Sequence, residues 1–497
     1  MDANNLDTML LAGSSIVLLA VLAVRASSWI GLPSLLIYLA MGVVLGESGL
    51  GVRFDDADTA HALGFAALVV ILTEGGLTTT WSEVRSSIGL GLLLASLGVA
   101  VSVSIVAVAS HAILALPWKM SFLLGAITSA TDAAAVFAVL RRVPLRPSLR
   151  GALEAESGLN DAATVLLVVL ISTRDGIGDG VPAFAGLVLY ELVGGVLGGA
   201  LVGMGGVWLL RRVALPASGL YPISVIAIAV LSYSGMAALH ASGFAAVYVT
   251  ALWLGNSDLP HRTSTRSFAE GLAWLAQIGL FIMLGLLVSP STITVTHLIS
   301  GAVVGAVLTL VARPVSVVAC ALPFRVPVPE QMFLSLAGLR GAVPIVLATV
   351  PLAEGVSGSV GVFNVVFVLV VVLTLLTAPA LPALAEALGV MVERTRDVEV
   401  EAAPLERIAA DLLQIKITDQ SRLHGVEVGE LRLPPGTSIS LVVRGASSFT
   451  PDRRTSLKRG DDLLIVTPRQ DRDATERRLQ AVSRSGRLAH WTRGDDA

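Results

Sequence analysis

Charged residues are scarce in this sequence. Lys, Arg, Asp and Glu make up 14% of its 497 residues, whereas soluble domains carry roughly 25%. Apolar residues account for 54%, and the mean hydropathy is +0.79. The few charges are sparse between about Leu10 and Leu388 and become dense after Val392. The composition therefore predicts a membrane-embedded part followed by a polar domain, with the boundary near residue 392.

Other absences exclude whole classes of protein. A single cysteine, Cys320, allows neither an intrachain disulfide nor a thiolate metal cluster. The seven histidines show no HExxH motif, and no Ser/His/Asp arrangement typical of an enzyme is present. The net charge of −3 disfavours a nucleic-acid partner. Residues Met1 to Asn5 are acidic where a signal peptide needs positive charge, so the first apolar run is predicted to be a retained membrane helix.

Long apolar runs fill the part before residue 392. A membrane-spanning helix needs about 20 largely apolar residues. Runs between charged or Pro/Gly-rich gaps predict about 13 such segments, at approximately 8–26, 32–47, 60–79, 86–115, 119–140, 151–173, 183–210, 220–238, 240–255, 267–289, 293–322, 329–351 and 360–389. We therefore expect residues 1–392 to form an all-α polytopic membrane domain.

The distribution of Lys and Arg predicts how this domain is oriented, because these residues favour cytoplasmic loops. With 13 spans the termini lie on opposite sides of the membrane. A cytoplasmic C-terminus leaves only Arg53, Lys119 and Arg174 outside, and it places inside Arg25, Arg85, Arg141, Arg142, Arg146, Arg150, Arg211, Arg212, Arg262, Arg266, Arg325, Arg394 and Arg396. We expect an outside N-terminus and a cytoplasmic C-terminal domain.

Carboxylates inside membrane spans mark candidate functional sites, because such a charge is costly unless it is paired or hydrated. Those in this sequence are Glu74, Asp132, Glu154, Glu156, Asp161 and Glu191. Arg340 lies deep in the twelfth span and needs a counter-charge. Arg313, in the inner half of the eleventh, is expected to snorkel to the interface or to line an inner vestibule.

Two predicted spans contain local interruptions. In the fifth, hydroxyls beside an aspartate in Thr128-Ser129-Ala130-Thr131-Asp132 indicate an unwound helix whose free carbonyls can bind a small cation. In the twelfth, two glycines and a proline lie between Ala337 and Pro344 and weaken the helix. These spans are seven apart, which fits two inverted six-helix repeats with crossed broken helices.

The sixth span contains the most informative stretch, Glu154-Ala155-Glu156-Ser157-Gly158-Leu159-Asn160-Asp161. On a helix, residues four apart share a face. Ser157 and Asp161 therefore present a hydroxyl and a carboxylate on one face. Glu156 and Asn160 lie on the neighbouring stripe, where they can support that site.

At these residues the chain resembles a known family. The Thr-Asp at 131–132, the Glu-Ser-x-x-Asn-Asp at 156–161 and the Gly-Leu-Arg-Gly-Ala at 338–342 together resemble cation–proton antiporters of the sodium/hydrogen-exchanger type. The most similar branch is the bacterial NhaP group that carries a regulatory domain and exchanges potassium for protons. Many relatives have Pro after the Thr-Asp, where this chain has Ala133.

The resemblance implies roles for individual residues. Asp161 would alternately bind a proton or the cation, with Asp132, Ser157 and Thr131 as further ligands. Glu74 resembles a site-facing glutamate, although a place at the cytoplasmic mouth remains open. The resemblance also implies a structural ion pair that joins the sixth span to the twelfth, formed by Glu156 and Arg340.

Asn160 bears on the stoichiometry. Relatives that move two protons per cation resemble this stretch but carry Asp at that position, so here one ionisable switch remains and an electroneutral 1:1 exchange is expected. Asn160 can at the same time be an ordinary hydrogen-bonding residue between helices.

The polar C-terminal part predicts a small α+β domain at 405–482, after a linker at 393–404 and before a disordered tail at 483–497. Period-two stretches predict strands at 413–417, 438–443 and 463–466, and a charged helix follows at about 470–482. The Pro-Pro-Gly at 434–436 and the Leu-x-x-Gly-Asp-x-Leu at 457–463 resemble the TrkA-C lobe of potassium-conductance regulators. Such lobes usually pair, and a passive dimerisation domain and a ligand sensor, with a nucleotide as one ligand, both remain open.

Together these features predict a homodimeric antiporter of the bacterial inner membrane that exchanges K⁺ for H⁺, is surrounded by lipid and uses no cofactor. Potassium is preferred over sodium only because of the appended domain, so an Na⁺/H⁺ antiporter is the alternative. A potassium channel with the same cytoplasmic module is a more distant rival. It would need a carbonyl filter such as Thr-Val-Gly-Tyr-Gly, which this sequence lacks.

Overall fold

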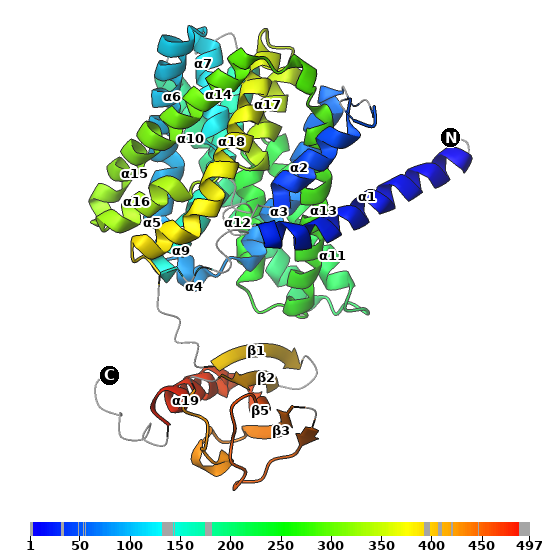
Figure 1. The fold of residues 1–497 in the computed structure, drawn as a ribbon, viewed down its shortest axis with the longest axis vertical. Helices are drawn as coiled ribbons and strands as arrows, with labels where there is room; N and C mark the ends of the chain where they lie inside the picture. Colours follow the sequence, from blue (N-terminus) through cyan, green and yellow to red (C-terminus); the bar gives the residue numbers. More distant parts are fainter. Residues whose placement is uncertain are drawn as a thin grey trace. The chain divides into compact units, whose positions relative to one another are not determined.

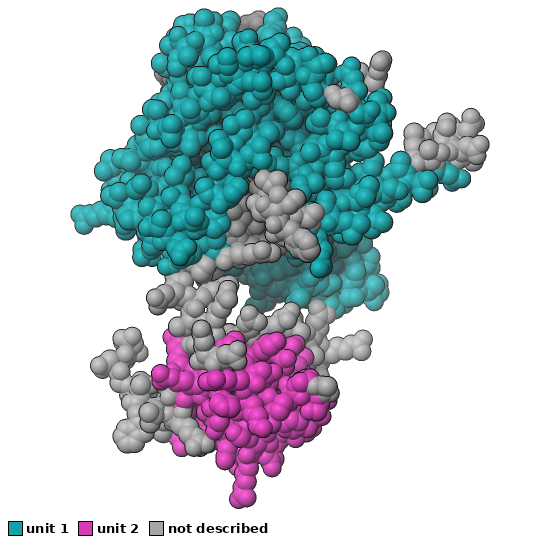
Figure 2. Space-filling model, in the orientation of Figure 1, with its two compact units in different colours: residues 1–392 teal, residues 393–497 magenta. Residues whose placement is uncertain are grey.

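The computed structural model describes residues 3–30, 34–47, 49–52, 54, 56–131, 143, 145–173, 181–391, 398–405, 410–418, 421–445 and 447–486. The chain divides into two compact units, residues 1–392 (unit 1) and 393–497 (unit 2), coloured separately in Figure 2. Each unit has its own cluster of buried apolar side chains.

Unit 1 is a bundle of helices (Figure 1). In chain order they are α1 (Ala3–Ile30), α2 (Ser34–Leu45), α3 (Ala57–Thr78), α4 (Trp81–Val84), α5 (Ile88–Leu93), α6 (Val99–Leu114), α7 (Trp118–Ser129), α9 (Pro147–Thr173), α10 (Val181–Arg212), α11 (Leu220–Ala238), α12 (Gly243–Gly255), α13 (Arg262–Leu287), α14 (Val295–Val307), α15 (Arg313–Ala321), α16 (Val328–Ala337), α17 (Ala342–Ala353) and α18 (Ser359–Ala387). Two π-helical turns, η1 (Leu94–Gly98) and η3 (Leu308–Ala312), join α5 to α6 and α14 to α15.

The described residues contain eight helices that are long and apolar enough to cross a membrane, or nine if α16 and α17 together form one bent span. Most of the predicted segments coincide with these helices; α11, for example, covers the predicted 220–238. Other predicted segments match shorter helices, such as α2 and α12, and the fifth extends past residue 131 into residues outside the description. The polytopic helical fold is therefore confirmed, and the count of 13 stays a prediction.

The centre of unit 1 is formed around α9 and α3. Helix α9 contacts α5, α7, α12 and α17, whereas α3 packs on α12, α13 and α17. Helix α1 packs against α2 and extends away from the other helices in Figure 1. Of the most apolar part of α9, 78% is buried, against 22–50% for the other long spans. Because α9 has almost no exposed face, its polar side chains point into protein.

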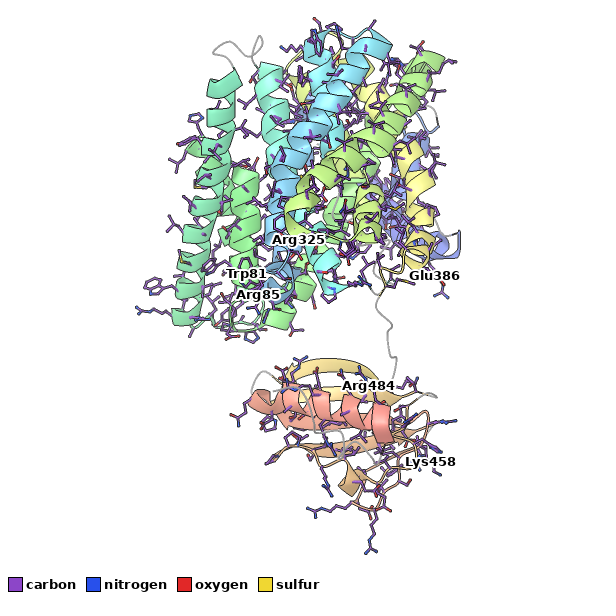
Figure 3. All side chains as sticks on the ribbon, turned by 90° about the vertical axis from the view of Figure 1, so that its left-hand side faces the viewer. Trp81, Arg85, Arg325, Glu386, Lys458 and Arg484 are labelled. Atoms are coloured by element: carbon purple, nitrogen blue, oxygen red, sulfur yellow. The ribbon has the colours of Figure 1, made fainter. Side chains whose placement is uncertain are left out.

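Both predicted interruptions coincide with helix ends. Helix α7 stops at Ser129, and Ala130 has an extended backbone. Helix α16 stops at Ala337 and α17 starts at Ala342, with a bend of 49° between them. The charged residues Arg85, Arg325 and Glu386 lie toward one and the same end of the bundle (Figure 3).

Unit 2 is a five-stranded antiparallel sheet with one helix. The strands are β1 (Val398–Leu405), β2 (Ala410–Ile417), β3 (Ser438–Arg444), β4 (Ser447–Phe449) and β5 (Asp462–Pro468), in the order β1-β2-β5-β3-β4, and α19 (Arg472–Ser485) follows them. The predicted strands lie within β2, β3 and β5. Strand β1 pairs with β2 along its whole length, so residues 398–404, which we expected in a linker, extend the sheet instead. Part of the predicted tail, residues 483–485, belongs to α19, and residues 487–497 lie outside the description.

Candidate cation site

Helix α9 carries a buried polar face at the level where α7 ends. The hydroxyls of Ser157 and Thr131 are hydrogen-bonded at 3.1 Å. The Asn160 amide donates to the Thr131 hydroxyl and to the Ser129 carbonyl, both at 3.2 Å. Because α7 is no longer helical after Ser129, its last carbonyls have no helical partner and can accept such bonds. Three predicted site residues, Thr131, Ser157 and Asn160, are therefore brought together, and Asp132 lies outside the described residues.

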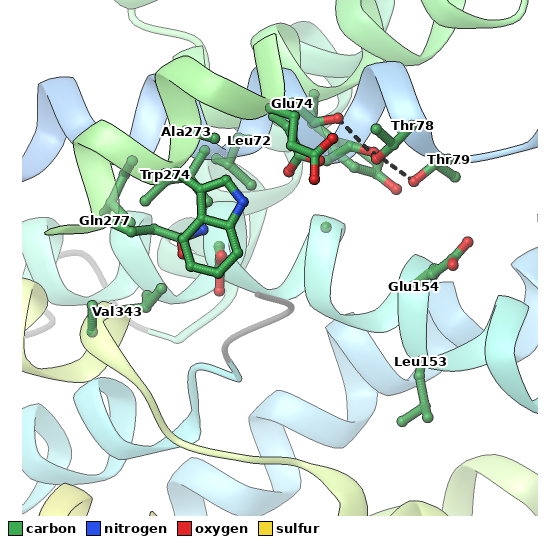
Figure 4. A pocket seen from close by; sticks show the side chains of 18 of the residues that line it. Leu72, Glu74, Thr78, Thr79, Leu153, Glu154, Ala273, Trp274, Gln277 and Val343 are labelled. Atoms are coloured by element: carbon green, nitrogen blue, oxygen red, sulfur yellow. Dashed lines mark hydrogen bonds between the residues drawn. The ribbon is translucent and has the colours of Figure 1, made fainter. Parts of the chain in front are cut away.

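Asp161 follows these residues on α9 and is 4% exposed. It lines a cavity of about 340 Å³ together with Glu74 from α3 and Glu154 from the start of α9. Figure 4 shows Glu74 beside Thr78 and Thr79, Glu154 on a separate helix, and Trp274 and Gln277 in the wall formed by α13. A buried carboxylate at the end of an accessible cavity can exchange a proton for a cation, because both reach it through the same opening.

Part of the cavity wall lies at the end of the bundle at which α18 finishes. Leu145, which lines the cavity, forms an isolated β-bridge with Met391 just after α18. The backbone amide of Arg146 also donates to the Val390 carbonyl. The wall around Leu145 is therefore joined to the segment that directly follows α18 in unit 1.

The predicted ion pair between Glu156 and Arg340 is not the one observed. Glu156 pairs with Arg313 of α15, and both side chains are buried. A second Arg313 nitrogen lies 3.3 Å from the other Glu156 oxygen, and Arg313 also donates to the Leu334 carbonyl at 3.0 Å. Arg313 thus joins α15, α9 and the last turn of α16, and it neither snorkels nor lines the cavity.

Arg340 lies in the interruption between α16 and α17 and is 2% exposed. Its backbone carbonyl accepts a hydrogen bond from Thr374 of α18 at 2.8 Å. Its guanidinium nitrogens make no hydrogen bond within the described part of the chain, but Glu156 and Asp161 attract it electrostatically. Arg340 therefore adds positive charge near the site, but it does not form the predicted ion pair with Glu156.

Sequence reasoning missed two residues. Arg313 was visible as a cation within a long apolar run, but its direction depends on the preceding π turn. Tyr248 of α12, which lines the cavity beside Gly158, was not singled out, because a lone tyrosine in an apolar helix carries no sequence signal of a site. Only the close approach of α12 to α9 reveals it.

The site offers oxygen atoms of hydroxyl, carbonyl, amide and carboxylate groups, the ligands that hard cations prefer. Among the residues with described positions, no group of three or more His, Cys, Asp or Glu side chains could hold a metal ion. The oxygen atoms gathered beside α9 are of the kind that can contact a hard cation.

Comparison with known proteins agrees with this geometry. The family model described as "Sodium/hydrogen exchanger, transmembrane" matches residues 15–387, and the TrkA-C domain model matches residues 412–480. The chain thus belongs to the sodium/hydrogen exchanger family, whose members are cation/proton antiporters of the membrane and not enzymes.

The names of individual relatives also state which ions those relatives exchange. The chain is 33% identical over 497 residues to the K⁺/H⁺ antiporter NhaP2 of Shewanella oneidensis, covering 97% of this chain and 84% of the relative. It is 36% identical to the K⁺/H⁺ antiporter NhaP of Alkalimonas amylolytica, covering 95% and 83%. The solved structure of the sodium proton antiporter MjNhaP1 from Methanocaldococcus jannaschii has the same fold, with a TM-score of 0.64 and 22% identity, covering 76% of this chain and 99% of that one.

Proposed function

We propose that this protein exchanges one K⁺ for one H⁺ across the bacterial inner membrane. Proton and cation compete for Asp161, with Asp132, Ser157 and Thr131 as further ligands and alternating access from the two sides. One observation carries the proposal: Asp161 is buried at the cavity and follows directly on the helix face that the broken α7 contacts through Thr131. Asn160 holds that broken segment in place through its two hydrogen bonds.

The balance of buried charges supports a 1:1 exchange. Glu156, Asp161, Arg313 and Arg340 are buried around the interruptions, and their formal charges sum to zero when Asp161 is ionised. Glu154 is also buried but pairs with Arg150 at 3.0 Å. An ionised Asp132 would leave one net negative charge, which a single proton or a single monovalent cation neutralises. Uncompensated charge is expensive in a low-dielectric interior, so the site should hold one or the other.

A 1:1 cycle moves no net charge. The membrane potential, which is worth about 2.3 kcal/mol per charge per 100 mV, would then neither drive nor oppose it. The rate of exchange is accordingly expected to be the same whether or not valinomycin and K⁺ collapse the potential.

Potassium is proposed because the relatives named above are K⁺/H⁺ antiporters and share the C-terminal domain. Sodium remains the alternative ion, since the same oxygen ligands serve both and selectivity depends on cavity geometry. We further propose an outside N-terminus, a cytoplasmic unit 2, and a homodimer in which unit 2 pairs and binds a regulatory ligand such as a nucleotide. Glu74 is proposed to guide cations at the cavity.

The site assignment is tested with a pH-sensitive dye in everted vesicles. Adding K⁺ should release protons from the vesicles with the native chain, and Asp161→Asn should abolish the signal because the amide cannot carry a proton. Glu386→Gln, an exposed carboxylate near the end of α18, is the matched control and should behave as the native chain. Unchanged exchange in Asp161→Asn would refute the site, and a response to Na⁺ alone would assign the ion to sodium.

A further inference from the structure

The wall of the cavity contains an unusually close contact between two helices. Tyr248 of α12 is 5% exposed, and its ring lies against the backbone of Gly158 on α9. A Cβ atom at position 158 would come within 2.3 Å of the ring Cζ and 2.7 Å of the phenol oxygen. Non-bonded atoms do not approach that closely, so the ring occupies space that any residue other than glycine would fill.

The contact with Tyr248 lies on α9 between two carboxylates that line the cavity, Glu154 and Asp161. Gly158 lies four residues after Glu154 and three before Asp161, and residues at these spacings share one face of a helix. All three residues and Tyr248 line the same cavity. Glu154 pairs with Arg150, whose side chain is 58% exposed, whereas Asp161 is 4% exposed. The ring of Tyr248 therefore lies between the mouth of the cavity and its deep end.

Tyr248 is held from the side opposite α9. Helix α12 packs mainly on α10, α3 and α11, so most of the contacts that fix the backbone of Tyr248 are made with helices other than α9. No side chain projects from Gly158 to interlock with the ring. The ring is thus held through α12, and Gly158 presents no side chain that would block its displacement along α9.

We propose that Tyr248 is a gating residue, which controls passage between the cavity mouth and Asp161, and that Gly158 is the slot through which its ring moves. This rests on the proposed exchange at Asp161. A cation on its way to Asp161 has to pass the ring with part of its water shell removed. Tyr248 acts through the path to the carboxylate, so it is a positioning residue and not a ligand.

The first test measures access directly. Cys320 is the single cysteine of the sequence, so Cys320→Ala provides a thiol-free background into which Asp161→Cys is introduced. The rate at which a cationic methanethiosulfonate labels this thiol in everted vesicles is then compared among Tyr248, Tyr248→Phe and Tyr248→Ala chains. Labelling follows the exposure of the thiolate, so we expect Tyr248→Ala to be labelled about tenfold faster and Tyr248→Phe to be labelled at the unchanged rate.

The second test uses the slot, in chains that keep Asp161 and Cys320. Gly158→Ala should lower K⁺/H⁺ exchange because the methyl group collides with the ring, and adding Tyr248→Ala should restore exchange in the double variant. Gly279→Ala of α13, where a Cβ meets nothing within 4 Å, is the matched control and should have no effect. Such a rescue shows that the methyl group acts through the ring, because substitutions at independent sites would add in their effects, and the labelling rates of the first test assign that contact to access rather than to packing alone.

Equal labelling of the Tyr248→Ala and Tyr248 chains, or loss of exchange in Gly158→Ala that Tyr248→Ala does not relieve, would overturn the gate. These outcomes are separate from a failure of the proposed function. If Asp161→Asn still exchanged ions, the site assignment would be wrong, whereas the labelling rates would still report whether Tyr248 controls access to position 161.

Discussion

At the scale of single residues, Glu156 and Arg313 form an ion pair that is buried within unit 1. Removing one member of a buried pair leaves the other without its counter-charge, at a cost of about 3–5 kcal/mol, whereas replacing both by apolar groups is often nearly neutral. The pair therefore determines which helices must stay together more than it adds stability.

The prediction at this scale concerns Arg313→Ala. It should strongly reduce the amount of folded protein and its thermal stability, because Glu156 and the Leu334 carbonyl lose their donor. Arg325→Ala, an exposed arginine at the end of the bundle, is the control. Fluorescence-detected size exclusion after heating measures both. The double variant Glu156→Gln, Arg313→Met should recover part of the loss, and an Arg313→Ala chain as stable as Arg325→Ala would contradict the role.

At the scale of elements, the interruptions could be foreseen and the ion-pair partner could not. Gly338, Gly341 and Pro344 act on their own backbone, so local sequence sufficed to locate the bend. The direction of Arg313 depends on the π turn at Leu308–Ala312 directly before it. One extra residue rotates all later side chains by about 100°, which takes Arg313 away from the interface and toward Glu156.

The two π turns also agree with the expected repeats. They lie in the fourth and eleventh predicted spans, as η1 and η3, and these are seven spans apart, like the interrupted fifth and twelfth. Strand β1 was missed for a different reason. Its alternating Val-Glu-Val-Glu pattern at 398–401 is a signal of a strand, but it falls where the change in composition indicated a linker.

A prediction at this scale tests the contact between the interruption and Arg313. A Cβ at Gly338 would lie 2.9 Å from one Arg313 terminal nitrogen and 3.1 Å from its Cζ. Gly338→Ala should therefore displace the guanidinium from Glu156 and destabilise unit 1 by about 1–3 kcal/mol, as overpacking does. Gly271→Ala of α13, with open space around the site, is the control. Equal melting temperatures of the two variants in detergent would contradict this prediction, because they would show that the Arg313 guanidinium can move aside without loss of stability.

At the scale of the whole molecule, the two units differ in where their apolar and charged side chains lie. Unit 1 keeps a few buried charges among helices whose outer surfaces expose large apolar side chains. Unit 2 encloses a small core behind one helix, with residues such as Leu413, Ile465 and Val442. The change in composition at residue 392 predicted this division, because charge density alone separates a lipid-facing surface from a water-facing one.

The stability of unit 2 should depend on pH through Asp461, which is fully buried. Burial alone would raise the pKa of this carboxyl. Two hydrogen bonds from Arg444, at 2.8 and 2.7 Å, and one from the Lys458 amide, at 2.8 Å, outweigh it and hold the pKa below its ordinary value. A lowered folded-state pKa contributes stability above the ordinary pKa of about 4, and that stability is lost as the pH falls through the folded-state value.

Asp461→Asn should therefore lower the free energy of unfolding of unit 2 at pH 7 by about 1.5–3 kcal/mol, the contribution of hydrogen bonds to a charged group. The loss should shrink as the pH falls below the ordinary pKa, because the carboxyl of the unfolded chain then binds a proton and the lowered folded-state pKa contributes less stability. Urea unfolding of residues 393–497, followed by circular dichroism, measures both effects. Asp473→Asn, an exposed carboxylate in α19, should change stability much less. A loss of the same size at pH 7 and pH 3 would contradict this prediction. It would mean that the packing of the Asp461 side chain against Arg444, and not its charge, provides the stability.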